Sequence, residues 1–335
     1  MSQSLDVEFM ARAIELARGG YPAPNPRVGC VLVRNGVIIG EGFHDHAGGP
    51  HAEIVALSSC ESARGATAYV NLEPCNHLGR TGPCSVALAQ AGVSRVVFSI
   101  WDPNEKAQGG SEYLCGEGIE VTSGVLEAQA RELNRQFLFS IEHQRPFVTL
   151  KAAVTRDGFL AREDGTSQWI SSEEARLDSH RLRAERGSVM VGRGTVLIDN
   201  PLLTARIPGV VNQPVRVVID PWRRLTGDER IFDDSAETLW LNRFDDRDLS
   251  VDGILQYLFE QGIRGVFVEG GAETLRRFLV MGVGQELVLY WGDIEFGSGK
   301  VWDGGWGGLS GLPVVDRTMF GSTERVTYDL QGKSV

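Results

Sequence analysis

Apolar positions along the chain follow two patterns, helical spacing and short apolar runs, which together predict a protein of alternating helices and strands. Helical spacing near the start relates Phe9, Met10, Ala13, Ile14 and Ala17. This spacing predicts a helix over residues 6–18. An Asn-Gly dipeptide inside the β-rich run 31–39 predicts a hairpin. We also expect helices at 51–59, 86–90 and 127–141, and strands at 68–72 and 95–100.

The alternation restarts after Gln144-Arg145-Pro146, which breaks the helical pattern and places a domain boundary near residue 145. In the second half we expect strands at 147–154, 189–191, 215–219, 238–241, 266–268 and 287–290, and helices at 172–185, 254–261 and 273–281. Residues 296–312 are rich in Gly and Trp and fit no regular element. The pattern predicts an α/β fold in two domains, residues 1–145 and 146–335.

Composition narrows the class of protein. A length of 335 residues is typical of two domains, and 42% hydrophobic with 23% charged residues is normal for a globular chain. The net charge of −11 favours a small-molecule substrate over nucleic acid, which usually requires a basic face. There is no run of 18 apolar residues, so we expect no membrane span. Five cysteines, an odd and sparse count, argue against a disulfide framework and for a cytoplasmic location.

Three residues in the first half form a candidate zinc site. His51-Ala52-Glu53 is followed by Pro74-Cys75 and then by Cys84. One His and two Cys leave the fourth tetrahedral position for a water, as in catalytic zinc sites. Zinc makes that water acidic enough to supply hydroxide at neutral pH. Glu53 lies two residues after His51, where its carboxylate can take the proton of the water and pass it to a leaving amine.

The same residues fit two other interpretations, a structural zinc site and a pair of core cysteines. His77 as a fourth ligand would make the zinc structural, and the two cysteines could instead be inert core residues. Zinc deaminases typically pair His-x-Glu with Pro-Cys-x-x-Cys. Here eight residues, 76–83, separate the two cysteines, and their polar, Gly-rich sequence predicts a loop beside the metal. Cys30, Cys60 and Cys115 stand alone and are expected to be buried or incidental thiols.

These motifs resemble a known family. Asn-Pro-Arg-Val-Gly at 25–29, Gly-Gly-Pro-His-Ala-Glu at 48–53 and Leu-Glu-Pro-Cys-Asn-His-Leu-Gly-Arg-Thr-Gly-Pro-Cys at 72–84 resemble the riboflavin-biosynthesis pyrimidine deaminase. The second half resembles the reductase partner of the same bifunctional protein. The stretches that carry this second resemblance are 145–151, 157–158, 167–170, 180–184, 191–206 and 268–271. Together the resemblance covers nearly the whole chain.

The resemblance implies a cytidine-deaminase-like three-layer α/β/α domain followed by a dihydrofolate-reductase-like α/β domain. It implies zinc-dependent removal of the 2-amino group of a diamino-hydroxy-pyrimidine that carries a phosphoribosylamino group. NADPH would then reduce the ribosyl chain to ribityl, giving 5-amino-6-(5-phosphoribitylamino)uracil. This family commonly assembles through its reductase half, so a homo-oligomer is expected.

The resemblance also assigns roles in the deaminase half. His51, Cys75 and Cys84 hold zinc, and Glu53 is catalytic. We expect the substrate to be bound by Asn25, His44, His77 and Arg80, with the Arg80 guanidinium at the 5′-phosphate. The alternatives are a turn-forming Asn25, solvated loop histidines and an ordinary exposed Arg80.

In the reductase half the resemblance assigns two groups of residues. The substrate-binding residues are Ser167, Arg183, Leu203, Arg206 and Glu269. The cofactor-binding residues are Trp169, Thr195, Asp199, Gly270 and Gly271, the glycines because backbone N–H groups at a helix start can hold a phosphate. A tight strand-to-helix turn without a ligand would have the same sequence pattern as these glycines. Without the resemblance, Trp169 would be interpreted as a core aromatic residue. Arg181 and Arg186 are expected on a solvated helix face.

The second half departs from the family pattern at several positions. Phe159 stands where Lys is usual, and Thr155-Arg156 where Ser-Leu is expected. Gln285-Glu286 and Glu295-Phe296-Gly297 replace an acidic pair and a Pro-x-Leu-Leu-Gly segment. The alternative function is therefore an active deaminase with a degenerate second domain that does not reduce. A zinc-containing nucleic-acid-binding or editing protein is disfavoured by the acidic charge and the long step between the cysteines.

Overall fold

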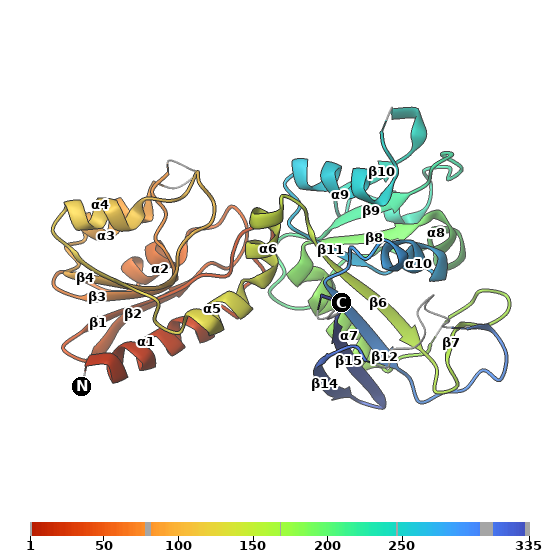
Figure 1. The fold of residues 1–335 in the computed structure, drawn as a ribbon, viewed down its shortest axis with the longest axis horizontal. Coiled ribbons are helices and arrows are strands. Elements are labelled where there is room, and N and C mark those ends of the chain that lie inside the picture. Colours follow the sequence, from red (N-terminus) through yellow and green to blue (C-terminus); the bar gives the residue numbers. More distant parts are fainter. Residues whose placement is uncertain (1, 78–81, 168, 246, 302–310, 332–335) are drawn as a thin grey trace. The chain divides into compact units, whose positions relative to one another are not determined.

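The computed structural model describes residues 2–77, 82–167, 169–245, 247–301 and 311–331. Contacts divide the chain into two compact units, Met1–His143 and Gln144–Val335. Each unit is an α/β structure with its own sheet and its own hydrophobic core (Figure 1). The division falls beside the break at Gln144-Arg145-Pro146.

The first unit is built on a five-stranded sheet in the order β2-β1-β3-β4-β5. Its strands are β1 (Gly29–Arg34), β2 (Val37–Phe43), β3 (Thr67–Leu72), β4 (Arg95–Ile100) and β5 (Glu120–Ser123). Its helices are α1 (Ser2–Leu16), α2 (Ala52–Ser58), α3 (Cys84–Gln90), α4 (Gly110–Gly116), α5 (Glu127–Leu133) and α6 (Arg135–His143). β1 runs antiparallel to β2 and β3, whereas β3, β4 and β5 are parallel. The hairpin expected around Asn35-Gly36 is confirmed.

Glycines let helices approach both faces of this sheet. A side chain at Gly29 would collide with the carbonyl of Ala13 on α1, and one at Gly42 with the backbone of Ala56 on α2. Gly42 pairs with Cys30, the neighbour of Gly29, so the two glycines point to opposite faces of the sheet. Helices therefore lie on both sides of the sheet, and the expected three-layer α/β/α arrangement is confirmed.

One predicted helix is two helices. Residues 127–141 were expected to form a single segment, but α5 ends at Leu133 and α6 begins at Arg135. The buried Asn134 between them binds the backbone of Arg27 twice: its amide oxygen accepts from the Arg27 N–H at 2.8 Å, and its Nδ2 donates to the Arg27 carbonyl at 3.0 Å. These tertiary hydrogen bonds override helical periodicity at this position.

The second unit has an eight-stranded sheet in the order β10-β9-β8-β11-β6-β12-β15-β14. The first six strands in that order are parallel: β10 (Thr238–Leu241), β9 (Val215–Ile219), β8 (Ser188–Gly192), β11 (Gly265–Val268), β6 (Phe147–Val154) and β12 (Glu286–Trp291). β15 (Thr323–Asp329) and β14 (Val314–Phe320) add an antiparallel edge. β7 (Phe159–Ala161) pairs separately with β13 (Lys300–Val301). All six strands expected in this half are confirmed.

Helices cover both faces of this sheet as well. The longer helices are α7 (Glu173–Arg186), α8 (Arg193–Asp199), α9 (Val251–Glu260) and α10 (Ala272–Val280), with short 3-10 turns at Arg230–Phe232 and Arg243–Asp245. On β11, Val266 and Val268 pack into the cluster that contains α9 and α10, whereas Phe267 faces α7. The hairpin of β14 and β15, the helix α8 and the short pair of β7 and β13 were not expected from the sequence.

Candidate active sites

The three proposed zinc ligands come from three separate elements of the first unit. His51 is the residue immediately before α2, Cys75 follows the end of β3, and Cys84 is the first residue of α3. The strand β3 lies inside the sheet, between β1 and β4, so its carboxyl end presents Cys75 to both helix starts. The fold thus joins residues that lie up to 33 positions apart.

The ligand atoms are spaced as a tetrahedral zinc site requires. Nδ1 of His51 lies 3.5 Å from Sγ of Cys75 and 3.3 Å from Sγ of Cys84, and all three ligand atoms lie within 4.8 Å of one another. Zinc–nitrogen and zinc–sulfur bonds of about 2.0 and 2.3 Å at a tetrahedral angle separate N and S by roughly 3.5 Å. The side chains therefore fit the metal. A hydrogen bond with Cys84 and one with His51 lower the pKa of the Cys75 thiol to about 4.

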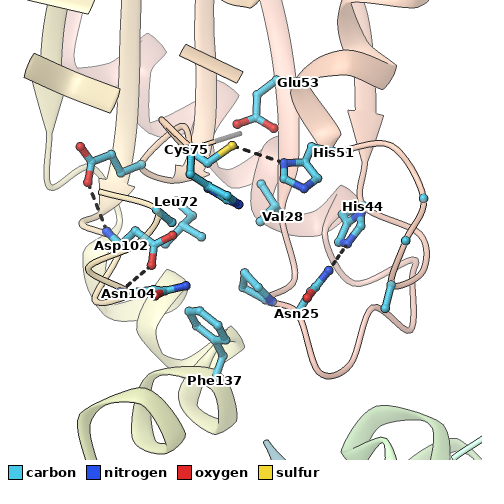
Figure 2. A pocket seen from close by; sticks show the side chains of 17 residues that line it. Asn25, Val28, His44, His51, Glu53, Leu72, Cys75, Asp102, Asn104 and Phe137 are labelled. Atoms are coloured by element: carbon cyan, nitrogen blue, oxygen red, sulfur yellow. Dashed lines mark hydrogen bonds between the residues drawn. The ribbon is translucent and has the colours of Figure 1, made fainter. Parts of the chain in front are cut away.

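Glu53 lies beside this group and is not part of it. Its side chain is 3% exposed, and burial raises the pKa of its carboxyl to about 7. In Figure 2, Glu53, His51 and Cys75 converge on one side of a cavity. His77 lines the same cavity but does not belong to the three-residue group found among the described residues.

The cavity has a volume of about 450 Å³ and is lined by Asn25, His44, His51, Glu53, Cys75 and His77, among others. Asn25 donates from Nδ2 to Nε2 of His44 at 3.0 Å (Figure 2). Nδ1 of His44 contacts the carbonyl oxygen of Pro50 at 3.0 Å. Burial lowers the pKa of His44, so its imidazole is neutral. Because Nδ1 faces the carbonyl oxygen of Pro50, which can only accept, the proton of the ring lies on Nδ1. Arg80 lies outside the described residues.

Sequence reasoning missed one side of this cavity, which is formed by Asp102, Asn104 and Phe137. Asp102 is buried, and burial raises the pKa of its carboxyl to about 6. A signal for it existed: Asp102 follows β4, which is parallel to β3, and the carboxyl ends of adjacent parallel strands meet at one edge. Phe137 comes from α6, and nothing in its local sequence marks it.

The second unit contains two adjoining cavities. The larger has a volume of about 790 Å³ and holds Ser167, Arg183, Thr195, Asp199, Leu203, Glu269, Gly270 and Gly271. The smaller, of about 240 Å³, holds Ser167, Trp169, Arg183, Asp199 and Arg206. All the proposed reductase residues therefore line one cavity or both. Trp169, expected at the cofactor, lines only the smaller cavity, where Arg176 stacks 4.4 Å above its ring.

A buried ion cluster joins the two cavities. The Arg183 guanidinium donates to both carboxylate oxygens of Glu269, with Nη2 to Oε2 at 2.9 Å. Nζ of Lys151 lies 3.6 Å from the same carboxylate. Burial opposes the charge on Glu269, but Arg183 and Lys151 outweigh it and hold the pKa of this carboxyl at about 2. Burial also lowers the pKa of Lys151, which Glu269 partly offsets.

Lys151 and His180 were also missed by sequence reasoning. Lys151 interrupts the otherwise apolar strand β6, and a charge in a buried strand is itself a signal of function. His180 lines the smaller cavity, and its Nδ1 lies 2.9 Å from the Thr204 carbonyl. Burial and the neighbouring Arg183 and Arg206 lower the pKa of His180 to about 4. Arg181, expected on a solvated face, is 43% exposed and pairs with Asp178, whereas Arg186 is only 15% exposed and pairs with Glu286.

The larger cavity fits a dinucleotide. The glycines at positions 192 and 270 lack a side chain that would collide with Thr274, so α10 packs closely against the ends of β8 and β11 and its start lines the cavity. No side chain caps the start of α10 at Gly271, and the Gly271 N–H donates to Thr195 Oγ1 at 3.0 Å. The next N–H groups of the helix can therefore hold a phosphate.

Comparison with known proteins supports the same division. The model of the cytidine and deoxycytidylate deaminase zinc-binding region matches residues 3–100, and the model of the RibD C-terminal domain matches residues 146–312. The riboflavin biosynthesis protein RibD of Aquifex aeolicus is 41% identical over 311 residues, which cover 87% of this chain and 87% of that protein. RibD of Escherichia coli is 40% identical over 319 residues, covering 85% and 87%.

Solved structures agree over the full length. A crystal structure from Thermotoga maritima, described as a diaminohydroxyphosphoribosylaminopyrimidine deaminase and 5-amino-6-(5-phosphoribosylamino)uracil reductase, has a TM-score of 0.88 and 37% identity, covering 98% of this chain and 99% of that one. RibD of Acinetobacter baumannii has a TM-score of 0.87 and 34% identity, with the same coverage.

Proposed function

Because the chain belongs to the RibD family of bifunctional deaminase–reductases in riboflavin biosynthesis, we propose that it acts on 2,5-diamino-6-(5-phosphoribosylamino)pyrimidin-4(3H)-one. The product of its two reactions is 5-amino-6-(5-phosphoribitylamino)uracil. The two activities, the zinc and the NADPH expected from the sequence are confirmed by the family. The alternative, a second half that does not reduce, is not supported.

The observation that carries the deaminase assignment is the three-ligand group next to a buried carboxylate. His51, Cys75 and Cys84 hold the zinc, which when bound makes water nucleophilic at neutral pH. In the hydrolysis, the oxygen of a water would bond to C2 of the pyrimidine, and the bond from C2 to the amino nitrogen would break to release ammonia. Glu53 accepts the proton of the water at its carboxylate and returns it to the departing nitrogen.

The remaining residues of the first cavity position the pyrimidine. Asn25 has a second amide proton and a carbonyl oxygen besides its bond to His44, and these suit the donors and acceptors of the ring. His44, neutral and fixed by Pro50, orients Asn25. His77 lines the cavity with a buried Nδ1 that has no hydrogen-bond partner among the described residues, so it is placed to bind substrate. Arg80 is proposed for the 5′-phosphate.

The reductase assignment depends on the ion cluster between the two cavities. Reduction breaks the bond from C1′ to the ring oxygen of the ribosyl group. A hydride is added at C1′, and a proton is added at that oxygen. NADPH would supply the hydride when bound in the larger cavity, whose lining includes Thr195 and Gly271. Lys151, whose side chain is 18% exposed and lies next to Glu269 at both cavities, is placed to supply the proton. Arg183 and Arg206, which line the smaller cavity, suit the phosphate of the substrate.

Ser167, Asp199 and Leu203 complete this site. Ser167 and Asp199 line both cavities, so each is placed to touch both reactants. Leu203 has a left-handed backbone with φ of 53° and is buried at the wall of the larger cavity. We assign Glu269 to substrate binding because its carboxylate orients Lys151 and Arg183. Trp169 forms part of the wall of the smaller cavity.

The expected homo-oligomer and cytoplasmic location are also part of this proposal. The edge strand β14 exposes Val314, Val315 and Met319, and an exposed apolar edge of a sheet suits a second copy of the chain. All five cysteines are free thiols, which suits a reducing compartment. No helix in the described part of the chain is both long and apolar enough to cross a membrane.

The test separates the two halves. Glu53→Gln is expected to keep zinc, because Glu53 is not a ligand, and to lose ammonia release from the diaminopyrimidine. NADPH oxidation with the deaminated intermediate supplied directly should be unchanged. Zinc content by atomic absorption, ammonia release and NADPH absorbance are the three measurements. Deamination by the variant at the rate of the unmodified protein would contradict the role given to Glu53. No NADPH oxidation by the unmodified protein would contradict the reductase assignment.

A further inference from the structure

The larger cavity crosses the ends of four neighbouring parallel strands. Its lining includes Lys151 on β6, Glu269 just after β11, Arg193 just after β8, and Pro221 just after β9. These strands are adjacent in the order β9-β8-β11-β6. Ligands of open parallel sheets bind beyond the carboxyl ends of the strands. Strands lie about 4.8 Å apart, so the cavity extends roughly 14 Å from β6 to β9.

The two ends of this cavity differ chemically. At the β6 end it adjoins the smaller cavity and shares Lys151, Ser167 and Arg183 with it, so the reacting nicotinamide end of the cofactor belongs there. The start of α10 at Gly271 lies at the middle strand, where it suits the pyrophosphate. The adenosine half of the cofactor is therefore left with the end formed by β8 and β9.

Arg193 is the cation at that end. Its side chain is 36% exposed, and its only ion pair among the described residues is with Asp220, at 3.9 Å from Nε to Oδ1. That distance is too long for a hydrogen bond. The guanidinium therefore keeps its N–H donors, while Asp220 holds it near the end of β9.

Asp220 lies between the lining residues Ile219 and Pro221 and behind Arg193. Its side chain is 1% exposed, and Oδ2 accepts from Leu225 N at 3.0 Å and from Trp240 Nε1 at 3.3 Å. Oδ1 is buried and has no hydrogen-bond partner among the described residues. A buried carboxylate oxygen without a donor is costly. A small movement of Arg193 toward Asp220 would satisfy it and would keep the guanidinium at this end of the cavity.

We propose that Arg193 binds the 2′-phosphate on the adenosine ribose of NADPH and so makes this enzyme select NADPH over NADH. The inference rests on the proposed reductase function, because it assumes that a nicotinamide dinucleotide fills the larger cavity. The 2′-phosphate is the sole difference between the two cofactors. A planar guanidinium with unused donors matches a phosphate in charge and in geometry.

Besides Arg193, Lys151 and Arg183, two more cations line the same cavity. Lys300 lies on β13, which pairs with β7 and not with the strands of the main sheet, and its Nζ is close to Gly165. Arg277 is exposed in the last turn of α10, beyond the helix start assigned to the pyrophosphate. Arg277 has the same side chain and lines the same cavity, so it serves as the matched control.

The experiment measures binding by titration calorimetry of the full-length protein with NADP⁺, NAD⁺ and 2′-AMP. A charge-assisted hydrogen-bonded phosphate corresponds to about 10- to 100-fold in affinity. Arg193→Gln is expected to lower the affinity for NADP⁺ by that factor and to abolish 2′-AMP binding. Its affinity for NAD⁺ should be unchanged. Arg193→Lys should keep part of the preference because it keeps the charge. Arg277→Gln should keep the NADP⁺-to-NAD⁺ ratio of the unmodified protein.

Three results would overturn the inference. The first is an unchanged affinity of Arg193→Gln for NADP⁺. The second is an equal loss of affinity for NADP⁺ and for NAD⁺ in that variant. The third is a loss of the preference for NADP⁺ over NAD⁺ in Arg277→Gln instead. Failure of the underlying function looks different, because the unmodified protein itself would then bind neither dinucleotide. The control for folding is the thermal unfolding temperature of Arg193→Gln. We expect it to equal that of the unmodified protein, because the Arg193 side chain is partly exposed.

Discussion

Removing the Glu269 carboxylate tests the buried ion cluster of the reductase half. Glu269→Gln leaves Arg183 and Lys151 buried without their anion. The pKa of this carboxyl falls from an ordinary 4.5 to about 2 in the folded protein. At about 1.4 kcal/mol per pKa unit, the ionised form stabilises the fold by about 3 kcal/mol. Loss of one partner of a buried ion pair costs about 3–5 kcal/mol in other proteins.

The pH dependence has a definite sign. Because folding lowers the pKa, the stabilisation is complete above pH 4.5 and is lost as the pH falls toward 2. The difference in unfolding free energy between the unmodified protein and Glu269→Gln should therefore be about 3 kcal/mol at pH 7 and about 1 kcal/mol at pH 3.

Urea unfolding followed by tryptophan fluorescence suits this measurement, because six of the seven tryptophans lie in the second unit. Glu273→Gln is the matched control: Glu273 is 73% exposed, and its ion pair in the described part of the chain is with Arg276 on the surface, so its loss should change stability by less than about 1 kcal/mol. The reasoning is refuted if Glu269→Gln is as stable as the control at pH 7, or if its deficit grows as the pH falls.

Two further outcomes concern the first unit. Chelation of zinc should stop ammonia release and leave NADPH oxidation with supplied intermediate intact, since all three ligands lie in the unit Met1–His143; parallel loss of both activities would contradict separate sites. Asn134→Ala should lower the free energy of unfolding of this unit by about 1–3 kcal/mol, because the Arg27 N–H loses its bond to the buried Asn134 and the Arg27 carbonyl keeps only its bond from Asn71. Urea unfolding followed by the fluorescence of Trp101 measures it, and an unchanged midpoint would show that water replaces the side chain.

Local patterns predicted most of the fold, because the strands are nearly continuous apolar runs and their lengths follow from their sequences. The run from Phe147 to Val154 is an example: its expected limits are those of β6. Tertiary contacts decided the exceptions. Asn134 divides a helical pattern because its partner, Arg27, lies 107 residues away. The exposed hairpin strand β14 shows no buried face that sequence periodicity could detect.

The candidate sites divide in the same way. His51, Glu53, Cys75 and Cys84 carry chemistry in their residue types and spacing, so sequence alone found them. The sequence marks Lys151 and Asp102 only as charges in or after buried strands, and their burial and the neighbours on other strands that shift their pKa values become visible in the folded chain. The Arg193 and Asp220 pair depends on the order of β8 and β9 in the sheet, which becomes visible only in the folded chain.

The wall shared by the two cavities of the second unit has a kinetic consequence. Five residues, Lys151, Ala153, Ser167, Arg183 and Asp199, face both spaces. Because the same five side chains contact both spaces, a cofactor bound in one and a substrate bound in the other would lie side by side. We therefore expect turnover through a ternary complex, in which the hydride passes directly from one bound molecule to the other. Because both molecules would contact the same side chains, we expect the affinity for each to depend on whether the other is bound.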